Sequence, residues 1–220
     1  MVKKKVPLPT LRRIPRYLRV AEELFEQKVN NISSADLARH LGFTASQVRQ
    51  DFSALREIYD ITVCGQQGCG YRTEVLRNTM AQILRLEEEK SGIAIGSDYL
   101  LRAVIQNMNF SVCGMKLGAI FTDDEDEEET VIHTVEGDLP VMKLSRLADY
   151  CQEKHPHIAL LACTPDAAQV LTDRLGDMGV KGIWNLTGTD ILGSDDMEVE
   201  DVNLYDSLMT LGARTKGTNN

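Results

Sequence analysis

The chain has 220 residues, of which 43% are apolar, and a net charge of −9. This length predicts one or two domains, and the ordinary apolar content excludes a largely disordered protein. No apolar run reaches the ~18 residues that cross a bilayer, and the first residues lack the apolar stretch of a signal peptide. We therefore expect a cytoplasmic protein with no membrane partner. Five dispersed cysteines, an odd number, argue against a disulfide scaffold.

The net charge hides a difference between the two parts of the chain. Residues 1–85 carry 14 Lys and Arg against 8 Asp and Glu, a net charge of +6. Residues 86–220 carry 10 against 25, a net charge of −15. This asymmetry indicates that only the amino-terminal part contacts nucleic acid.

Apolar side chains at helical spacing predict a first helix from Ile14, with Pro15 in its first turn. Ser33 caps a second helix that ends at Gly42, and Thr44 caps a third. The link between the second and third helices is only about three residues, the length found in a helix-turn-helix. The side chains expected to be buried are Ile14, Tyr17, Leu18, Ala21, Leu24, Phe25, Leu37, Ala38, Leu41, Val48, Phe52 and Leu55.

The period changes after Tyr59. Residues 61–63 are rich in β-branched side chains, and the glycine-rich residues 65–71 predict a turn and a short return strand. Three helices and this hairpin predict a winged helix-turn-helix domain over residues 1–86. A fourth helix follows from Thr73 to about Leu86, with Val75, Thr79, Ile83 and Leu86 facing inward.

The second part alternates apolar strands with helices, which is typical of a parallel α/β sheet. The predicted strands are residues 93–96, 117–122, 158–162, 182–184 and 199–202. The predicted helices lie near residues 99–108, 144–154, 167–178 and 204–211. Residues 123–129 are all acidic and predict a solvated loop. We assign residues 87–203 to a Rossmann-like domain and residues 204–220 to a terminal helix and tail.

The third helix has a polar face opposite its apolar one. Arg side chains suit the base edge of guanine, Gln side chains suit adenine, and Ser side chains suit either base. The arginines that precede this helix in the chain, Arg19 among them, suit contacts with phosphates or with a minor groove. The alternative is a solvated face in an ordinary three-helix bundle. The residues expected to contact DNA, including those of the wing, are Arg12, Arg13, Arg16, Ser46, Gln47, Arg49, Gln50, Ser53, Gln66, Gln67 and Tyr71.

Motifs in both parts resemble the Rex family of redox-sensing repressors. In the first part they are residues 9–15 (PTLRRIP), 33–37 (SSADL), 48–53 (VRQDFS) and 68–71 (GCGY). In the second part they are residues 167–169 (AAQ), 172–175 (TDRL) and 179–185 (GVKGIWN). The resemblance extends over about residues 6 to 211 in the family's order.

The resemblance implies a homodimer whose winged helices bind a palindromic operator. It also implies a Rossmann-like domain that binds NADH or NAD⁺, with NADH releasing the DNA. A carboxy-terminal helix, here residues 204–211, would be swapped between the subunits. The residues at the cofactor positions would be Gly96, Ser97, Asp98, Thr122, Asp123, Thr164 and Pro165.

The chain departs from the family at its phosphate loop. Where the family has three glycines, this chain has Gly96 followed by Ser97 and Asp98, and a bulky Leu101 comes shortly after. In the family, the glycines that this chain lacks let the backbone approach the pyrophosphate and let the helix pack closely on its strand. Asp98 would also place a carboxylate near the diphosphate.

Three further departures concern the ribose and the switch. Thr122 stands where the family has a ribose-binding acid, and the alternative is that the strand end shifts and Asp123 takes this place. Met108 and Asn203 stand where the family has a tyrosine and an aspartate of the ligand-linked rearrangement. We therefore expect weak or lost NADH sensing. The alternatives are a fully NADH-responsive Rex protein and, third, a nicotinamide-dependent oxidoreductase. The sequence has no nucleophile–base constellation, so we expect no enzymatic activity.

The cysteines allow two interpretations. Cys64 and Cys69 flank the wing turn, so they either form a redox switch or are ordinary small residues. We expect Cys113, Cys151 and Cys163 to lie in the core. The histidines and cysteines lack zinc spacing, so we expect no metal site.

Overall fold

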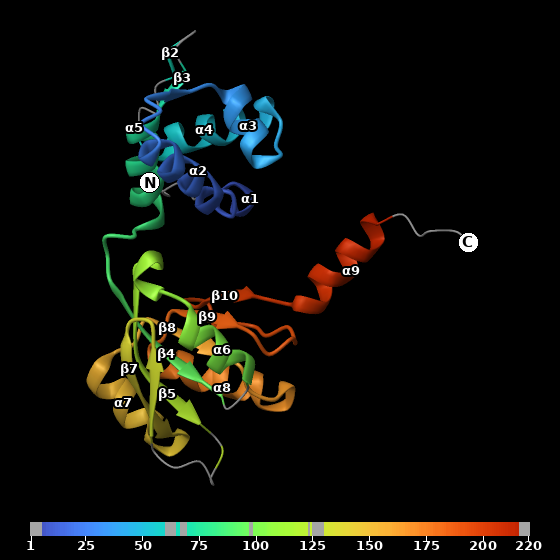
Figure 1. The fold of residues 1–220 in the computed structure, drawn as a ribbon. Helices are drawn as coiled ribbons and strands as arrows, with labels where there is room; N and C mark the ends of the chain where they lie inside the picture. The colour runs from blue at the N-terminus through green and yellow to red at the C-terminus, as the bar shows by residue number, and fades with distance from the viewer. Residues whose placement is uncertain are drawn as a thin grey trace. The chain divides into compact units, whose positions relative to one another are not determined.

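The computed structural model describes residues 6–59, 65–66, 70–96, 99–122, 124 and 130–215. The chain divides into two compact units, Met1–Glu87 and Glu88–Asn220 (Figure 1). This division falls next to the boundary expected after residue 86. No helix within the described ranges is long and apolar enough to cross a membrane.

The amino-terminal unit combines helices with a small antiparallel sheet of order β1-β3-β2. The helices of this unit are α1 (Leu8–Leu11), α2 (Ile14–Glu26), α3 (Ser34–Leu41), α4 (Ala45–Tyr59) and α5 (Thr73–Leu84). The strands are β1 (Asn31–Ile32), β2 (Gly65–Gln66) and β3 (Gly70–Arg72). The three predicted helices and the return strand of the wing are present, while residues 61–63 lie outside the described residues. The short α1 and β1 are additions that the pattern did not predict.

The helix ends follow the capping residues. The Ser33 hydroxyl accepts a hydrogen bond from the backbone N–H of Asp36 at 3.0 Å, which begins α3. Gly42 ends α3 in the left-handed conformation, with φ of +68°. The Thr44 hydroxyl then accepts from the backbone N–H of Gln47 at 3.1 Å. The three-residue link between α3 and α4 is therefore set by local chemistry, as predicted.

The predicted core of α2, α3 and α4 is confirmed at every position except Phe25. Phe25 is 40% exposed at the end of α2, and its ring lies 4.0 Å from the guanidinium carbon of Arg77. On α5 the buried face is Thr73, Leu76, Thr79, Met80 and Ile83. Val75 and Leu86 are only half-buried, because the helix turns Leu76 and Met80 inward instead.

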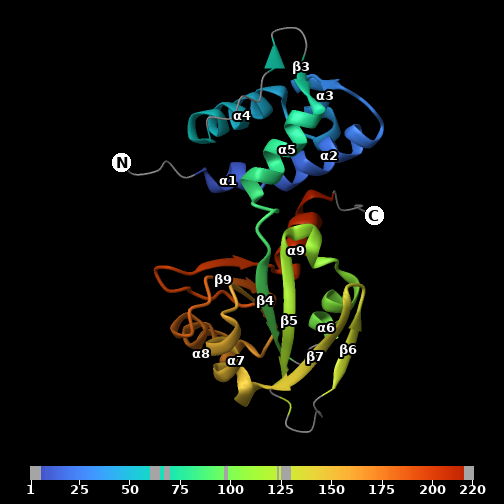
Figure 2. The ribbon, with the colours of Figure 1, turned by 90° about the vertical axis from the view of Figure 1, so that its left-hand side faces the viewer.

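The second unit contains a seven-stranded sheet of order β10-β9-β8-β4-β5-β7-β6 (Figures 1 and 2). The strands are β4 (Lys90–Ile95), β5 (Met115–Thr122), β6 (Val131–Thr134), β7 (Gly137–Lys143), β8 (Ile158–Leu161), β9 (Gly182–Asn185) and β10 (Glu198–Asp201). All neighbours pair in parallel except β6 and β7. The five predicted strands are confirmed, and the β6–β7 hairpin was missed.

Helices cover both faces of this sheet (Figure 2). On one face α6 (Tyr99–Asn107) packs against side chains such as Ala94 and Ile120. On the other, α7 (Leu147–Lys154) and α8 (Pro165–Asp177) pack against side chains such as Ile95 and Phe121. Because the chain changes faces between β4 and β8, a topological switch point lies at the carboxyl ends of these two strands.

Three short elements complete the unit. They are the 3₁₀ helices η1 (Phe110–Cys113) and η2 (Leu144–Arg146), and the terminal helix α9 (Leu204–Arg214). Cys113 ends η1 and is exposed, so its predicted place in the core is wrong. Cys151 is buried as predicted, and Cys163 is half-buried against the same core.

Candidate DNA-reading face and nucleotide crevice

The polar face of α4 is the candidate reading surface. Val48, Phe52 and Leu55 are buried on the inner side of α4. Four of the predicted DNA-contacting residues, Ser46, Arg49, Gln50 and Ser53, are exposed on it. The helix thus presents hydrogen-bonding side chains outward from a fixed core, which suits the readout of base edges.

Gln47 behaves differently from its neighbours on α4. It is half-buried, and its amide nitrogen donates to the carboxylate of Asp51 at 3.2 Å. The amide is therefore oriented by the protein itself, because a carboxylate can only accept.

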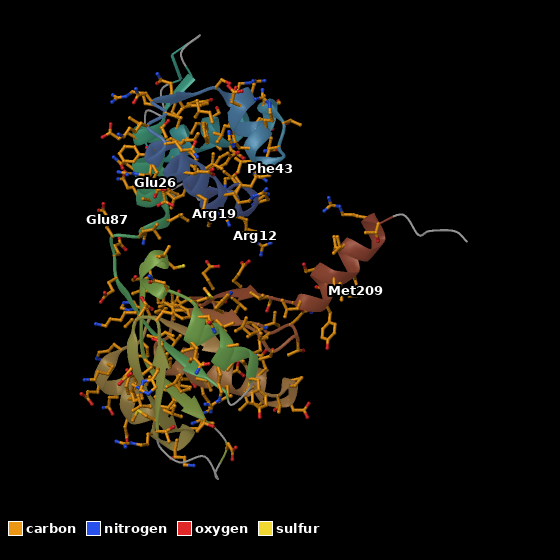
Figure 3. The ribbon with its side chains drawn as sticks, viewed as in Figure 1. Arg12, Arg19, Glu26, Phe43, Glu87 and Met209 are labelled. Carbon is orange, nitrogen blue, oxygen red and sulfur yellow. The ribbon has the colours of Figure 1, made fainter. Side chains whose placement is uncertain are left out.

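The predicted arginines differ in what they contact. Arg13 forms a two-pronged ion pair with Asp51, with nitrogen–oxygen distances of 2.6 and 2.7 Å. Arg16 donates to the backbone carbonyl of Leu41 at 2.6 Å and stacks over the Phe43 ring at 4.5 Å. Arg12, labelled in Figure 3, is exposed at the end of α1. Arg13 is therefore held by Asp51, and Arg12 is exposed at the surface.

The wing is described in part. Tyr71 on β3 is half-buried, and its ring meets that of Phe52 edge-on at 4.8 Å. Burial raises the pKa of Tyr71. The backbone of Gln66 pairs with Gly70 across the hairpin. Gln67, Cys64 and Cys69 lie outside the described residues, so their predicted roles stay predictions.

Gly96 occupies the switch point of the larger sheet. Its φ is +136°, and a Cβ built on it would lie 2.0 Å from the backbone oxygen of Ala162. Its backbone N–H donates to Phe121 at 2.8 Å. Only glycine fits this close approach of β4 to the end of β8. Ser97 and Asp98, which follow, lie outside the described residues.

The other predicted crevice residues come from the ends of β5 and β8. Thr122 is buried, and its hydroxyl accepts from the backbone N–H of Asp124 at 3.2 Å. Thr164 and Pro165 are exposed where α8 begins, and the Thr164 side chain makes no capping hydrogen bond there. A helix start of this kind attracts anions. Asp123 lies outside the described residues.

The other residues predicted to depart from the family pattern have structural roles here. Leu101 lies on the inner side of α6 and is fully buried, so it packs in the core and not toward the predicted cofactor positions, contrary to expectation. Met108 is half-buried against the same core. Asn203 caps α9 by accepting from the backbone N–H groups of Tyr205 and Asp206 at 3.0 and 3.3 Å.

Helix α9 has an uncovered apolar surface. It follows β10 and leads away from the sheet of its unit, with Met209 labelled in Figure 3. None of its residues is buried. The exposed apolar side chains of α9 are Leu204, Tyr205, Leu208, Met209 and Leu211. A soluble chain usually covers such a helix with another surface.

Comparison with known proteins places the chain in a family. Residues 5–53 match the family described as "Putative DNA-binding protein N-terminus". The redox-sensing transcriptional repressor Rex of Caldicellulosiruptor bescii is 36% identical over 209 residues, which cover 95% of this chain and 92% of that protein. The Clostridium novyi repressor Rex is 34% identical over 217 residues, 99% of each chain. The chain belongs to the Rex family.

Solved Rex structures share its fold. The structure of RSP in complex with β-NAD⁺ and operator DNA is 35% identical, with a TM-score of 0.85, and covers 96% of this chain and 93% of its own. RSP in complex with β-NADH is 33% identical, with a TM-score of 0.81, over 96% and 95%. Rex proteins are transcriptional repressors and not enzymes, which agrees with the expectation of no enzymatic activity.

Two polar clusters of this Rex-family chain escaped the sequence analysis. Asp51 is buried among hydrogen-bond donors of the first unit. Asn185 is buried at the end of β9, where its amide nitrogen donates to Asp201 at 2.6 Å and to the backbone of Thr189 at 2.7 Å. A polar residue inside an apolar helical or strand pattern was the only available signal for either cluster. Within the described residues, no group of acidic, histidine or cysteine side chains could hold a metal ion.

Proposed function

We propose that this Rex-family chain is a homodimeric repressor that binds double-stranded operator DNA through α4 and the wing. The observation that carries the proposal is the exposed row of Ser46, Arg49, Gln50 and Ser53 above the buried side of α4. The Rex relatives and the RSP complex with operator DNA support it. DNA also suits the positive charge of residues 1–85.

The side chains divide into base readers and backbone contacts. Arg49 can pair with guanine and Gln50 with adenine in the major groove. Arg12 and Arg16 suit the phosphates. Arg13 and Arg16 both also make contacts within the protein, with Asp51 and with the Leu41 carbonyl respectively.

We infer that two copies pair through α9. Its apolar side chains are exposed in the part of the chain that the structure describes, and a two-fold dimer would bury the same surface of each copy. Two reading helices would then meet half-sites one or more DNA turns apart.

A dinucleotide would bind at the switch point, outside the carboxyl ends of β4 and β8. Gly96 permits the close turn, and the start of α8 at Thr164 offers a place for an anion. When bound, the dinucleotide would supply the redox signal, through the difference between NADH and NAD⁺. The RSP complexes with NAD⁺ and NADH favour a responsive protein, which is the second candidate.

We propose nevertheless that NADH binds this chain weakly. The sequence places the carboxylate of Asp98 just after Gly96 and puts Thr122 where the family has an acid. Like charges about 4 Å apart repel by roughly 1–4 kcal/mol between water-like and surface-like dielectric. Leu101 does not oppose the diphosphate, because it packs in the core.

One experiment tests these proposals together. The protein first selects a duplex from a random library. This duplex is then titrated with the protein, with and without NADH or NAD⁺. Calorimetry measures binding of each dinucleotide directly. We expect tight binding to the selected duplex that neither dinucleotide changes. Micromolar NADH binding with release of the duplex over the same range would establish the responsive alternative. Failure to select any duplex would refute the DNA-binding proposal.

A further inference from the structure

Asp51 is a buried carboxylate in the middle of the reading helix α4, with only 1% of its side chain exposed. Its Oδ2 accepts from Arg13 Nε at 2.7 Å and from the Tyr17 hydroxyl at 2.8 Å. Its Oδ1 accepts from Arg13 Nη2 at 2.6 Å, from the Thr10 hydroxyl at 3.1 Å and from Gln47 Nε2 at 3.2 Å. Both oxygens are therefore held in place by charged and neutral donors.

These donors come from separate elements. Thr10 belongs to α1, Arg13 stands at the junction before α2, and Tyr17 lies within α2. Because Arg13 engages both carboxylate oxygens, the ion pair fixes an angle as well as a distance. A single side chain of α4 thus sets the position of the segment that carries Arg12.

The carboxylate is charged at neutral pH. Burial by itself raises the pKa of Asp51, but hydrogen bonds from Arg13, Tyr17 and Thr10 outweigh it, so the pKa lies below its usual value. A buried ion pair commonly adds little net stability compared with apolar packing, and its best-attested use is to fix one arrangement. The cluster is therefore better explained by the geometry it imposes than by the stability it adds.

We propose that Asp51 is a positioning residue for DNA recognition. It fixes α1 and the following Arg12 in register with α4, and it orients the amide of Gln47 beside the exposed reading side chains. Backbone contacts set the register in which base contacts are read. A change in the separation between Arg12 and α4 therefore weakens base readout more than general attraction to DNA. This inference rests on the proposed DNA-binding function.

The test compares the selected duplex with a scrambled duplex of equal length. For Asp51→Asn we expect the ratio of the two affinities to fall about tenfold, the effect of losing a hydrogen-bonded charge. Affinity for scrambled DNA should change far less. Tyr17→Phe removes one donor but keeps the ring that packs on Phe43 and Phe52, and its ratio should fall about threefold. Leu76→Ala serves as the control, because it loosens the same core from α5.

The outcomes distinguish the positioning role of Asp51 from the proposed DNA-binding function. If the parent protein does not distinguish the two duplexes, the proposed function itself fails. If the parent does and both Asp51→Asn and Tyr17→Phe keep the full ratio, only the positioning role of Asp51 is refuted. This role is also refuted if Leu76→Ala lowers the melting temperature by the same amount as Asp51→Asn and lowers the affinity ratio by as much. If Asp51→Asn does not fold, Tyr17→Phe decides alone.

Discussion

Leu208→Asp tests whether α9 is the surface through which two copies pair. Leu208 is 66% exposed in the single chain, in the middle of the apolar side of α9. Covering a leucine completely is worth about 1.5–3 kcal/mol, so covering the exposed part of Leu208 is worth roughly 1–2 kcal/mol. An aspartate in the same place would lose this gain and would have to shed its water.

The cost of burying the aspartate charge is larger than the loss of the apolar contact. Burying an unpaired charge costs several kcal/mol even after relaxation, and a two-fold interface contains the substitution twice. A total of at least about 3 kcal/mol corresponds to roughly a hundredfold weaker self-association. We therefore expect Leu208→Asp to be a monomer at concentrations where the parent is a dimer.

Sedimentation velocity across micromolar concentrations measures this change. Thr210→Asp is the matched control, because it adds the same charge to the same helix on the side away from Leu208. We expect Thr210→Asp to remain a dimer. A Leu208→Asp protein that associates as strongly as the parent would show that the interface lies elsewhere, and the reasoning from α9 would be wrong.

Three further predictions concern DNA, the crevice and acid. Arg49→Ala and Gln50→Ala should each lower discrimination between selected and scrambled DNA by ~1–3 kcal/mol in competition anisotropy. Arg12→Ala should instead weaken binding to both duplexes and flatten its salt dependence. If all three variants bind the selected duplex with equal affinity, α4 is not the reading helix. Gly96→Ala should lower the melting temperature more than Gly137→Ala, because both have positive φ but only Gly96 lacks room for a Cβ; equal losses would show that backbone strain alone matters. Because the folded-state pKa of Asp51 is lowered, its stabilisation is present above the usual carboxyl pKa of about 4 and is lost as pH falls towards the folded value. Denaturant unfolding of Asp51→Asn should therefore depend less on pH in that acid range, and an unchanged dependence would contradict the assigned direction.

The elements whose signals are local could be predicted from the sequence. Ser33, Gly42 and Thr44 act on backbone groups within a few residues, so they define the helix-turn-helix by themselves. The central strands β4, β5 and β8 contain continuous apolar runs, which are recognisable because both faces of these strands are buried. The uncovered side of α9 was visible as leucines at helical spacing.

Other features depended on how distant segments pack. Arg13 and Asp51 are 38 residues apart, so their ion pair exists only because the folded chain brings the residue before α2 next to α4. The same packing holds Arg13 against Asp51 and places Leu101 in the core. Helical spacing defines which residues share a face, but it does not say which neighbour that face meets. Capping and periodicity are properties of a few consecutive residues, whereas burial and ion pairing are properties of surfaces that only the folded chain brings together.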